Sequence, residues 1–230
     1  MTSPITPPST PEAVEQLNDQ LAREHPIDEY YQRSPFVIRF IQARRLSIIK
    51  RMTASRPGLK IIEVGSGGGH VLRMFPEAKL TAVDVSQVYL DTARKNLAGY
   101  DVEFCKGELS GLNFEQGSFD RVICTEVLEH TTDPGEVLSQ IRRLLRTDGR
   151  AVITVPVDPL INRIKTIVRY TPVGWLLGNR VNWGGDHYHL HTWWPWQFER
   201  LLREDFVVTD RAAAPAWAMP LHACFACRPR

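Results

Sequence analysis

Residues 61–70 read IIEVGSGGGH, and this stretch decides the fold. Its apolar run predicts a buried strand, and the glycines at 65, 67, 68 and 69 predict a tight loop directly after it. Glycine accepts positive φ and, having no Cβ, lets the backbone approach a ligand closely. The apolar rhythm of residues 70–75 predicts a helix whose N-terminus points at that ligand. The stretch therefore predicts a nucleotide-like ligand on the loop.

The composition is that of a globular protein with one main domain. The chain has 230 residues, of which 43% are apolar and 23% charged, and 28 basic against 26 acidic residues leave a net charge of +2. That balance gives no electrostatic case for nucleic acid. A local basic cluster is interpreted as a solvated helix face; its members are Arg39, Arg44, Arg45, Lys50 and Arg51.

The lack of an expected targeting signal and the positions of the cysteines both indicate a cytoplasmic protein. No apolar run is as long as a spanning helix, and residues 1–11 have no apolar core, so neither a membrane anchor nor a signal peptide is expected. The four cysteines fall at predicted strands and are expected to be free thiols. Cys224 and Cys227 form a C-x-x-C pair, but residues three apart in a strand point to opposite faces.

The order of the patterns predicts three parts. Residues 1–10 are expected to be a disordered tail, residues 11–57 an N-terminal cover with helices at 11–24 and 35–53, and residues 58–230 an α/β domain. Strands are expected at 59–64, 79–83, 101–105, 119–124, 150–155, 206–212 and 219–228, and helices at 86–97, 133–146 and 194–203. This pattern predicts a Rossmann-like, doubly wound sheet of five parallel strands plus a C-terminal antiparallel hairpin, with helices on both faces.

The spacing of the glycines separates two kinds of nucleotide loop. A dinucleotide fingerprint needs a third glycine at position 70, where this chain has His70. This disfavours an NAD(P)-dependent oxidoreductase. Instead, Glu63 precedes G-x-G-x-G by two residues, and Asp84 ends the second predicted strand, where such sheets place an acid that binds ribose hydroxyls.

Four motifs in order, within residues 59–155, resemble class I S-adenosylmethionine-dependent methyltransferases. Besides the loop and Asp84, they are the GEL…LNF…GSFD segment at 107–120 and TEVLEHTTDP at 125–134. The last is most similar to type 11 methyltransferases and to the O-methyltransferases of ubiquinone biosynthesis. Glu108 and Asn113 stand where most relatives have Asp and Pro.

The resemblance implies S-adenosylmethionine as cofactor and S-adenosylhomocysteine as product. The cofactor residues it implies are Glu63, Gly65, Ser66, Gly67, Gly69, Asp84, Val85, Glu108, Leu109 and Thr125.

In the ubiquinone relatives an E-x-x-E-H set, here Glu126, Glu129 and His130, is associated with a divalent ion such as Mg²⁺. On a helical turn these three side chains would share a face. The alternative is buried hydrogen bonding near the cofactor.

Residues 158–193 form an insertion expected to face the substrate. Its apolar and basic composition is typical of an interfacial helix, and relatives touch membrane there, which predicts peripheral membrane contact through 160–180 and a lipidic acceptor. The alternative is a helix packed on its own domain. His187, His189 and His191 alternate, as on one strand-like face. His189, then His187, with His130 nearby, are the candidates for a catalytic base.

The sequence thus predicts O-methylation of a small or lipidic hydroxyl acceptor, such as a phenol or quinone precursor. Two alternatives stay open: an RNA ribose 2′-O-methyltransferase, which would need a basic groove, and a cofactor-binding protein without catalysis.

Overall fold

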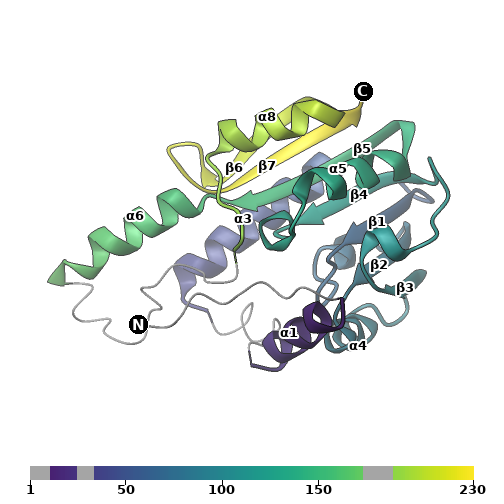
Figure 1. Ribbon diagram of the computed structural model, residues 1–230, viewed down its shortest axis with the longest axis horizontal. Coiled ribbons are helices and arrows are strands. Elements are labelled where there is room, and N and C mark those ends of the chain that lie inside the picture. Colours follow the sequence, from purple (N-terminus) through teal and green to yellow (C-terminus); the bar gives the residue numbers. More distant parts are fainter. Residues whose placement is uncertain (1–10, 25–33, 173–188) are drawn as a thin grey trace.

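One mixed sheet forms the centre of the molecule. The computed structural model describes residues 11–24, 34–172 and 189–230, and within them seven strands run in the order β3-β2-β1-β4-β5-β7-β6 (Figure 1). The strands are β1 Lys60–Val64, β2 Lys79–Asp84, β3 Val102–Lys106, β4 Phe119–Thr125, β5 Leu145–Pro156, β6 Phe206–Ala216 and β7 Met219–Pro229. The first five are parallel, and β7 is antiparallel to both neighbours. The predicted sheet with its C-terminal hairpin is confirmed.

Helices cover both faces of this sheet. One face carries α3 (Phe36–Thr53) and α4 (Gln87–Asn96), and the other carries α5 (Pro134–Leu144) and α8 (Pro195–Asp205). α1 (Pro11–Glu24) lies beside α4, and α6 (Asp158–Arg169) extends away from the end of β5 (Figure 1). Short 3₁₀ turns follow three strands: η1 (Leu72–Met74), η2 (Leu109–Gly111) and η3 (Leu128–His130). Among the described helices, none combines the length and apolarity that crossing a membrane requires.

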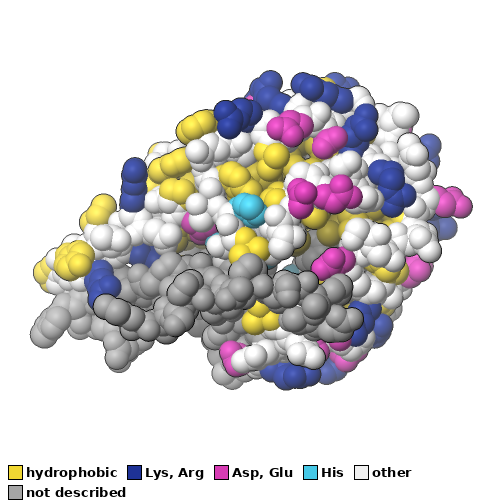
Figure 2. Space-filling model, in the orientation of Figure 1, with side chains coloured by type: hydrophobic (Ala, Val, Ile, Leu, Met, Phe, Trp, Pro, Cys, Tyr) yellow, Lys and Arg dark blue, Asp and Glu magenta, His cyan; other side chains and the backbone are white. Residues whose placement is uncertain are grey.

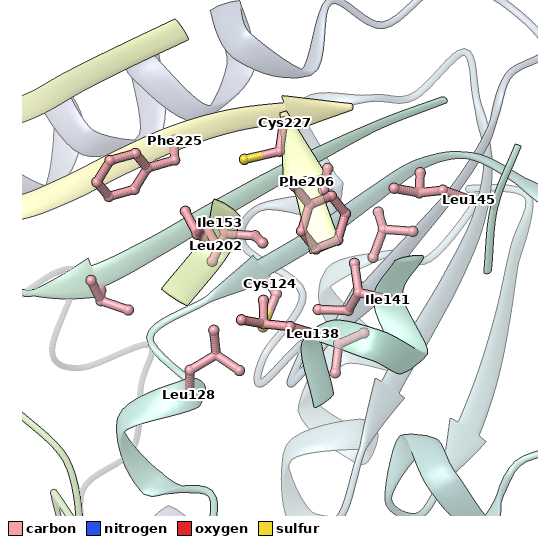
Figure 3. Packing of buried hydrophobic residues seen from close by; sticks show 14 of the residues in the cluster. Cys124, Leu128, Leu138, Ile141, Leu145, Ile153, Leu202, Phe206, Phe225 and Cys227 are labelled. Atoms are coloured by element: carbon pink, nitrogen blue, oxygen red, sulfur yellow. The ribbon is translucent and has the colours of Figure 1, made fainter. Parts of the chain in front are cut away.

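Strand residues alternate between the two apolar layers. On β7, Phe225 and Cys227 pack with α5 and α8, whereas Cys224 and Ala226 pack beneath α3. Figure 3 shows Phe225 and Cys227 in the first of these layers, together with Leu202 of α8. This is the period-two pattern of a strand buried on both sides. It confirms that Cys224 and Cys227 face opposite ways, and all four cysteines are free thiols.

The segment after the glycine loop differs from the expectation. Instead of a helix over residues 70–75, the chain makes the single 3₁₀ turn η1 and leaves helical geometry at Phe75, whose φ is −127° and ψ 58°. Pro76 explains this, because a proline disfavours helical backbone at the residue before it and offers no N–H to continue the ladder. The loop is therefore followed by a turn, with no helix N-terminus of full length.

Three helices fall in the ranges predicted for the N-terminal cover and the insertion. α1 and α3 occupy the ranges expected for the two cover helices, and α6 supplies a helix at the start of the insertion. The predicted tail, residues 1–10, lies outside the described residues, as do residues 173–188 of the insertion, including His187.

Candidate active site

A cavity of about 540 Å³ opens at the carboxyl ends of β1 to β4. This is the edge of an open parallel sheet where ligands bind. Of the ten predicted cofactor residues, all except Gly69 line it: Glu63, Gly65, Ser66, Gly67, Asp84, Val85, Glu108, Leu109 and Thr125. One wall comes from α1, through Val14, Leu17 and Asn18.

The glycines of the loop have separate roles. Gly65, Gly67 and Gly69 all have positive φ, at 70°, 50° and 75°. A Cβ on Gly65 would lie 2.3 Å from Cγ2 of Val127, and one on Gly69 would lie 2.9 Å from Cδ1 of Leu97. Gly65 thus lets the loop pass close to the segment after β4, whereas Gly69 lets the turn pack on α4.

Asp84 ties two loops together at the cavity wall. Its Oδ2 accepts from the backbone N–H of Gly67 at 2.8 Å, and its Oδ1 accepts from the N–H of Ser86 at 2.9 Å. Burial raises the pKa of this carboxyl, while the two N–H groups oppose that rise. Each oxygen keeps a further lone pair, so the carboxylate can accept two hydroxyl groups from a ligand.

Glu63, near the end of β1, is buried next to the glycine loop. Its side chain is 1% exposed, and burial, followed by the charge on Asp84, raises its pKa well above the usual range. The nearby backbone N–H of Leu72 and the side chain of Thr125 partly offset this rise. Glu63 therefore lies among β1, the turn η1 and the end of β4.

Arg45 is a functional candidate that the sequence interpretation missed. It was expected on a solvated face together with Arg39, Arg44, Lys50 and Arg51. Those four side chains are exposed, but Arg45 is only 6% exposed and lines the cavity. Its position was readable, because it occupies the same helical stripe as the buried Ile41, Ile48 and Ile49.

Glu126 departs from the predicted metal-binding turn. Its φ is +56°, so residues 126–130 do not form one helical turn with three ligands on a face. Its carboxylate instead meets Nη1 of Arg45 at 3.3 Å, the Thr154 hydroxyl at 2.8 Å and Nδ1 of His222 at 2.8 Å. Burial alone would raise the pKa of Glu126, but His222 and Arg45 outweigh it and hold the pKa well below its usual range.

Glu129 and His130 lie together with a residue from the far end of the insertion. One ligand-type atom each of Glu129, His130 and His189 falls within 4.8 Å of the others, and the two imidazoles meet edge to face at 4.7 Å. Nδ1 of His189 lies 2.7 Å from Oδ2 of Asp158, which is buried at the start of α6. Burial, and then the charge on Glu126, raises the pKa of Glu129.

Backbone hydrogen bonds fix this group in place. The N–H groups of Leu190 and His191 both donate to the carbonyl of Glu129, at 2.7 and 3.2 Å. His130 lines the cavity, and His189 lies behind it. His191 stacks on Trp193 instead of sharing a face with His189. Residue spacing in the sequence did not indicate Asp158 or His222, because their partners lie 31 and 96 residues away.

Known sequences match the core of this chain. Residues 62–153 match the model of a methyltransferase domain family. The chain is 32% identical over 131 residues to a mitochondrial ubiquinone biosynthesis O-methyltransferase of Schizosaccharomyces pombe, covering 51% of this chain and 47% of that protein. It is 35% identical over 126 residues to a ubiquinone biosynthesis O-methyltransferase of Caulobacter vibrioides, covering 50% and 49%. The chain spans about half the length of these curated relatives.

Solved structures share the whole fold at low identity. A magnesium protoporphyrin IX methyltransferase from Synechocystis, with bound S-adenosylhomocysteine, superposes with a TM-score of 0.67 at 17% identity, covering 94% of this chain and 99% of that one. A 1,6-didemethyltoxoflavin N1-methyltransferase from Burkholderia thailandensis gives 0.64 at 19%, covering 97% and 92%. The likeness includes the strands and helices outside residues 62–153.

We expect Gly65→Ala to destabilise the protein more than Gly58→Ala. Both glycines have positive φ, but a Cβ at Gly58 meets nothing within 4 Å, whereas one at Gly65 meets Val127. The clash should add roughly 1–3 kcal/mol to the loss of unfolding free energy, measured by urea denaturation. Combining Gly65→Ala with Val127→Ala should recover part of it, and equal losses in the two single variants would contradict this account.

Proposed function

We propose that this chain binds S-adenosylmethionine in the cavity and catalyses methyl transfer, because residues 62–153 match the model of a methyltransferase domain family and the fold is that of solved methyltransferases. The observation that carries the proposal is the position of Asp84 beside the glycine loop, with both oxygens turned to loop N–H groups and the cavity in front of them. An adenosyl group offers two ribose hydroxyls to such a carboxylate.

The residues around the cavity divide the binding of the cofactor. Asp84 accepts the ribose hydroxyls, and Glu108 and Leu109 lie where the adenine would meet η2. Glu63 holds the loop on which the methionine part would rest, and Arg45 supplies a buried positive charge for a carboxylate at that end. Thr125 and Glu126 close the cavity at the end of β4.

When bound, S-adenosylmethionine supplies a methyl group on a sulfonium. The main task of the protein is then to align acceptor and methyl group and to exclude water. A phenolic acceptor must also lose its proton. We assign this task to His130, which lines the cavity, with His189 behind it and Asp158 orienting the His189 ring through Nδ1.

The alternative role of Glu129, His130 and His189 is to bind a divalent ion. Glu129, His130 and His189 offer one carboxylate oxygen and two imidazole nitrogens, and the Asp158 carboxylate on His189 is the kind of outer partner that metal-bound histidines have. This donor set suits Mn²⁺, Fe²⁺ or Zn²⁺ better than Mg²⁺, which prefers oxygen ligands. Glu126, from the predicted set, is engaged by Arg45 and His222 instead.

For the acceptor we propose a hydroxyl on a phenol-like or quinone-like ring, with a lipidic substituent. The ubiquinone-pathway relatives support this class, although a relative from Hahella chejuensis, 24% identical over 155 residues, is named as a C-methyltransferase. α6 supports the lipidic part, because Ile167 on this helix is 66% exposed and Tyr170, directly after it, is 82% exposed. Figure 2 shows hydrophobic side chains along this arm of the molecule.

We expect isothermal titration calorimetry to show binding of S-adenosylhomocysteine, and Asp84→Ala to weaken it by at least about tenfold. A hydrogen bond to a charged group contributes roughly 1.5–3 kcal/mol, and two would be lost. Asp91→Ala is the matched control, because Asp91 is an exposed acid on α4 that contacts only its own helix in the described structure. Absence of binding in the wild type would overturn the proposed function.

Replacing His130 by Ala should lower kcat by about 100-fold and leave the affinity for S-adenosylhomocysteine unchanged, as expected for loss of a base. The reaction would be followed by release of S-adenosylhomocysteine with a prenylated catechol as acceptor. His191→Ala is the control, because His191 stacks on Trp193. EDTA should not inhibit. If EDTA inhibits the enzyme and Mn²⁺ restores its activity, the assignment of His130 as a base is wrong and a metal site takes its place.

If α6 rests on membrane, the wild type should float with anionic liposomes, since Arg163 and Arg169 accompany its apolar residues. The double variant Ile167→Glu, Tyr170→Glu should stay in the bottom fraction. Val207→Glu is the control, because Val207 is 44% exposed on the edge strand β6. Equal recovery of all three proteins would exclude membrane contact through this helix.

A further inference from the structure

The first helix of the described chain, α1, lies against the cofactor cavity. Val14, Leu17 and Asn18 of α1 line the cavity opposite the sheet. Of the side chains described on α1, Ala22 is buried, and the others are partly or fully exposed. Among these described side chains, Ala22 contributes little buried apolar area because it is small.

Polar contacts from one face of α1 attach it to neighbouring elements. Oδ1 of Asp19 accepts a hydrogen bond from the Ser86 hydroxyl at 2.5 Å and lies 3.4 Å from the N–H of Val88. Both groups belong to the start of α4, where Ser86 is the N-cap. A carboxylate at a helix N-terminus is favoured by its unpaired N–H groups and by the helix dipole. Asp19 therefore adds a second cap to α4 from another helix.

A second contact is weaker. Glu15 and Lys106 pair at 2.6 Å, with side chains about 40% exposed. An exposed pair of this kind contributes little. Asp19 is better sheltered, with a side chain 16% exposed, although it also meets the exposed Arg23 at 3.5 Å. Asp19 is thus the main polar anchor of α1 among the contacts of the described residues.

The anchor leads directly to the residues that would hold the ribose. Ser86, which donates its hydroxyl to Asp19, donates its backbone N–H to Asp84, and Asp84 in turn accepts from Gly67. A single line of hydrogen bonds therefore runs from α1 through the start of α4 to the glycine loop. The position of α1 and the shape of the ribose site are coupled through these bonds.

We propose that α1 is a wall of the cofactor site and that Asp19 is the positioning residue that keeps it closed over the bound cofactor. The proposal rests on the proposed binding of S-adenosylmethionine in this cavity. With Asp19 in place, Val14, Leu17 and Asn18 cover the ligand, and its departure requires the Asp19–Ser86 hydrogen bond to break. Without Asp19 the wall opens more often, so the ligand leaves faster.

The test is the binding of S-adenosylhomocysteine to full-length variants, by calorimetry for the dissociation constant and by stopped flow for the dissociation rate. Asp19→Ala should weaken binding by about tenfold, mainly through faster dissociation. Alanine is the better helix former, so the effect cannot come from a weaker helix. Asp19→Asn keeps an acceptor oxygen for Ser86 and should restore most of the affinity.

Two matched controls lie on the same helix. Arg23→Ala removes the exposed partner of Asp19, and Gln16→Ala removes an exposed side chain, so both should bind like the wild type. Hydrogen exchange should rise over residues 14–24 in Asp19→Ala while β1 and β4 stay protected.

If Asp19→Ala has the same dissociation constant and dissociation rate as the wild type, the role of Asp19 is overturned and the proposed function stays intact. A wild type that does not bind S-adenosylhomocysteine would overturn both.

Discussion

The site depends on the carboxylate of Asp84, which accepts one backbone N–H from the loop after β1 and one from the loop after β2. These loops leave neighbouring parallel strands, so one side chain at the end of β2 can reach both. Without it, the N–H groups of Gly67 and Ser86 would need other partners and the two loops would separate. The carboxylate is costly to bury, as its raised pKa indicates, and its two backbone donors offset that cost.

Buried charges are arranged in the same manner deeper in the site. Glu63, Glu126 and Glu129 lie near the ends of β1 and β4; the charge on Arg45 lowers the pKa of all three, and His222 lowers the pKa of Glu126 further. Arg45 comes from α3, before the sheet in sequence, and His222 comes from β7, at its end. Glu126 takes a left-handed backbone conformation to reach both of them. Strain of this kind in a residue other than glycine is common where function requires it.

Much of the fold was predictable because its signals are local. Alternating apolar strands, the N-cap at Ser86 and the glycine loop each depend on residues within a few positions, and the five parallel strands with a C-terminal hairpin followed from the order of these local patterns. The helix after the loop was wrong because Pro76 outweighs the apolar rhythm before it. Arg45 was misread because its neighbours in sequence are exposed while its neighbours on the helix are buried.

The contacts of the candidate site were harder to predict because they join distant residues. Glu126 meets His222, and His189 meets Asp158, across separations that no spacing rule connects. Site roles for Glu126, Glu129, His130 and His189 were predicted from the sequence. Their division into one group around Glu126 and another around His189 follows from the backbone turn at Glu126. Sequence patterns identify such residues, whereas tertiary packing decides their partners.

The strand order β5-β7-β6 also constrains how the sheet can assemble. β6 precedes β7 in the sequence, yet β7 lies between β6 and the rest of the sheet and pairs with both. β6 therefore cannot join by itself. The folding order with the smallest loss of chain entropy closes the short loop between β6 and β7 first and then pairs the hairpin with β5. Because His222 sits on β7, the partner of Glu126 arrives with that docking event, and the floor of the site is completed at the same moment as the sheet.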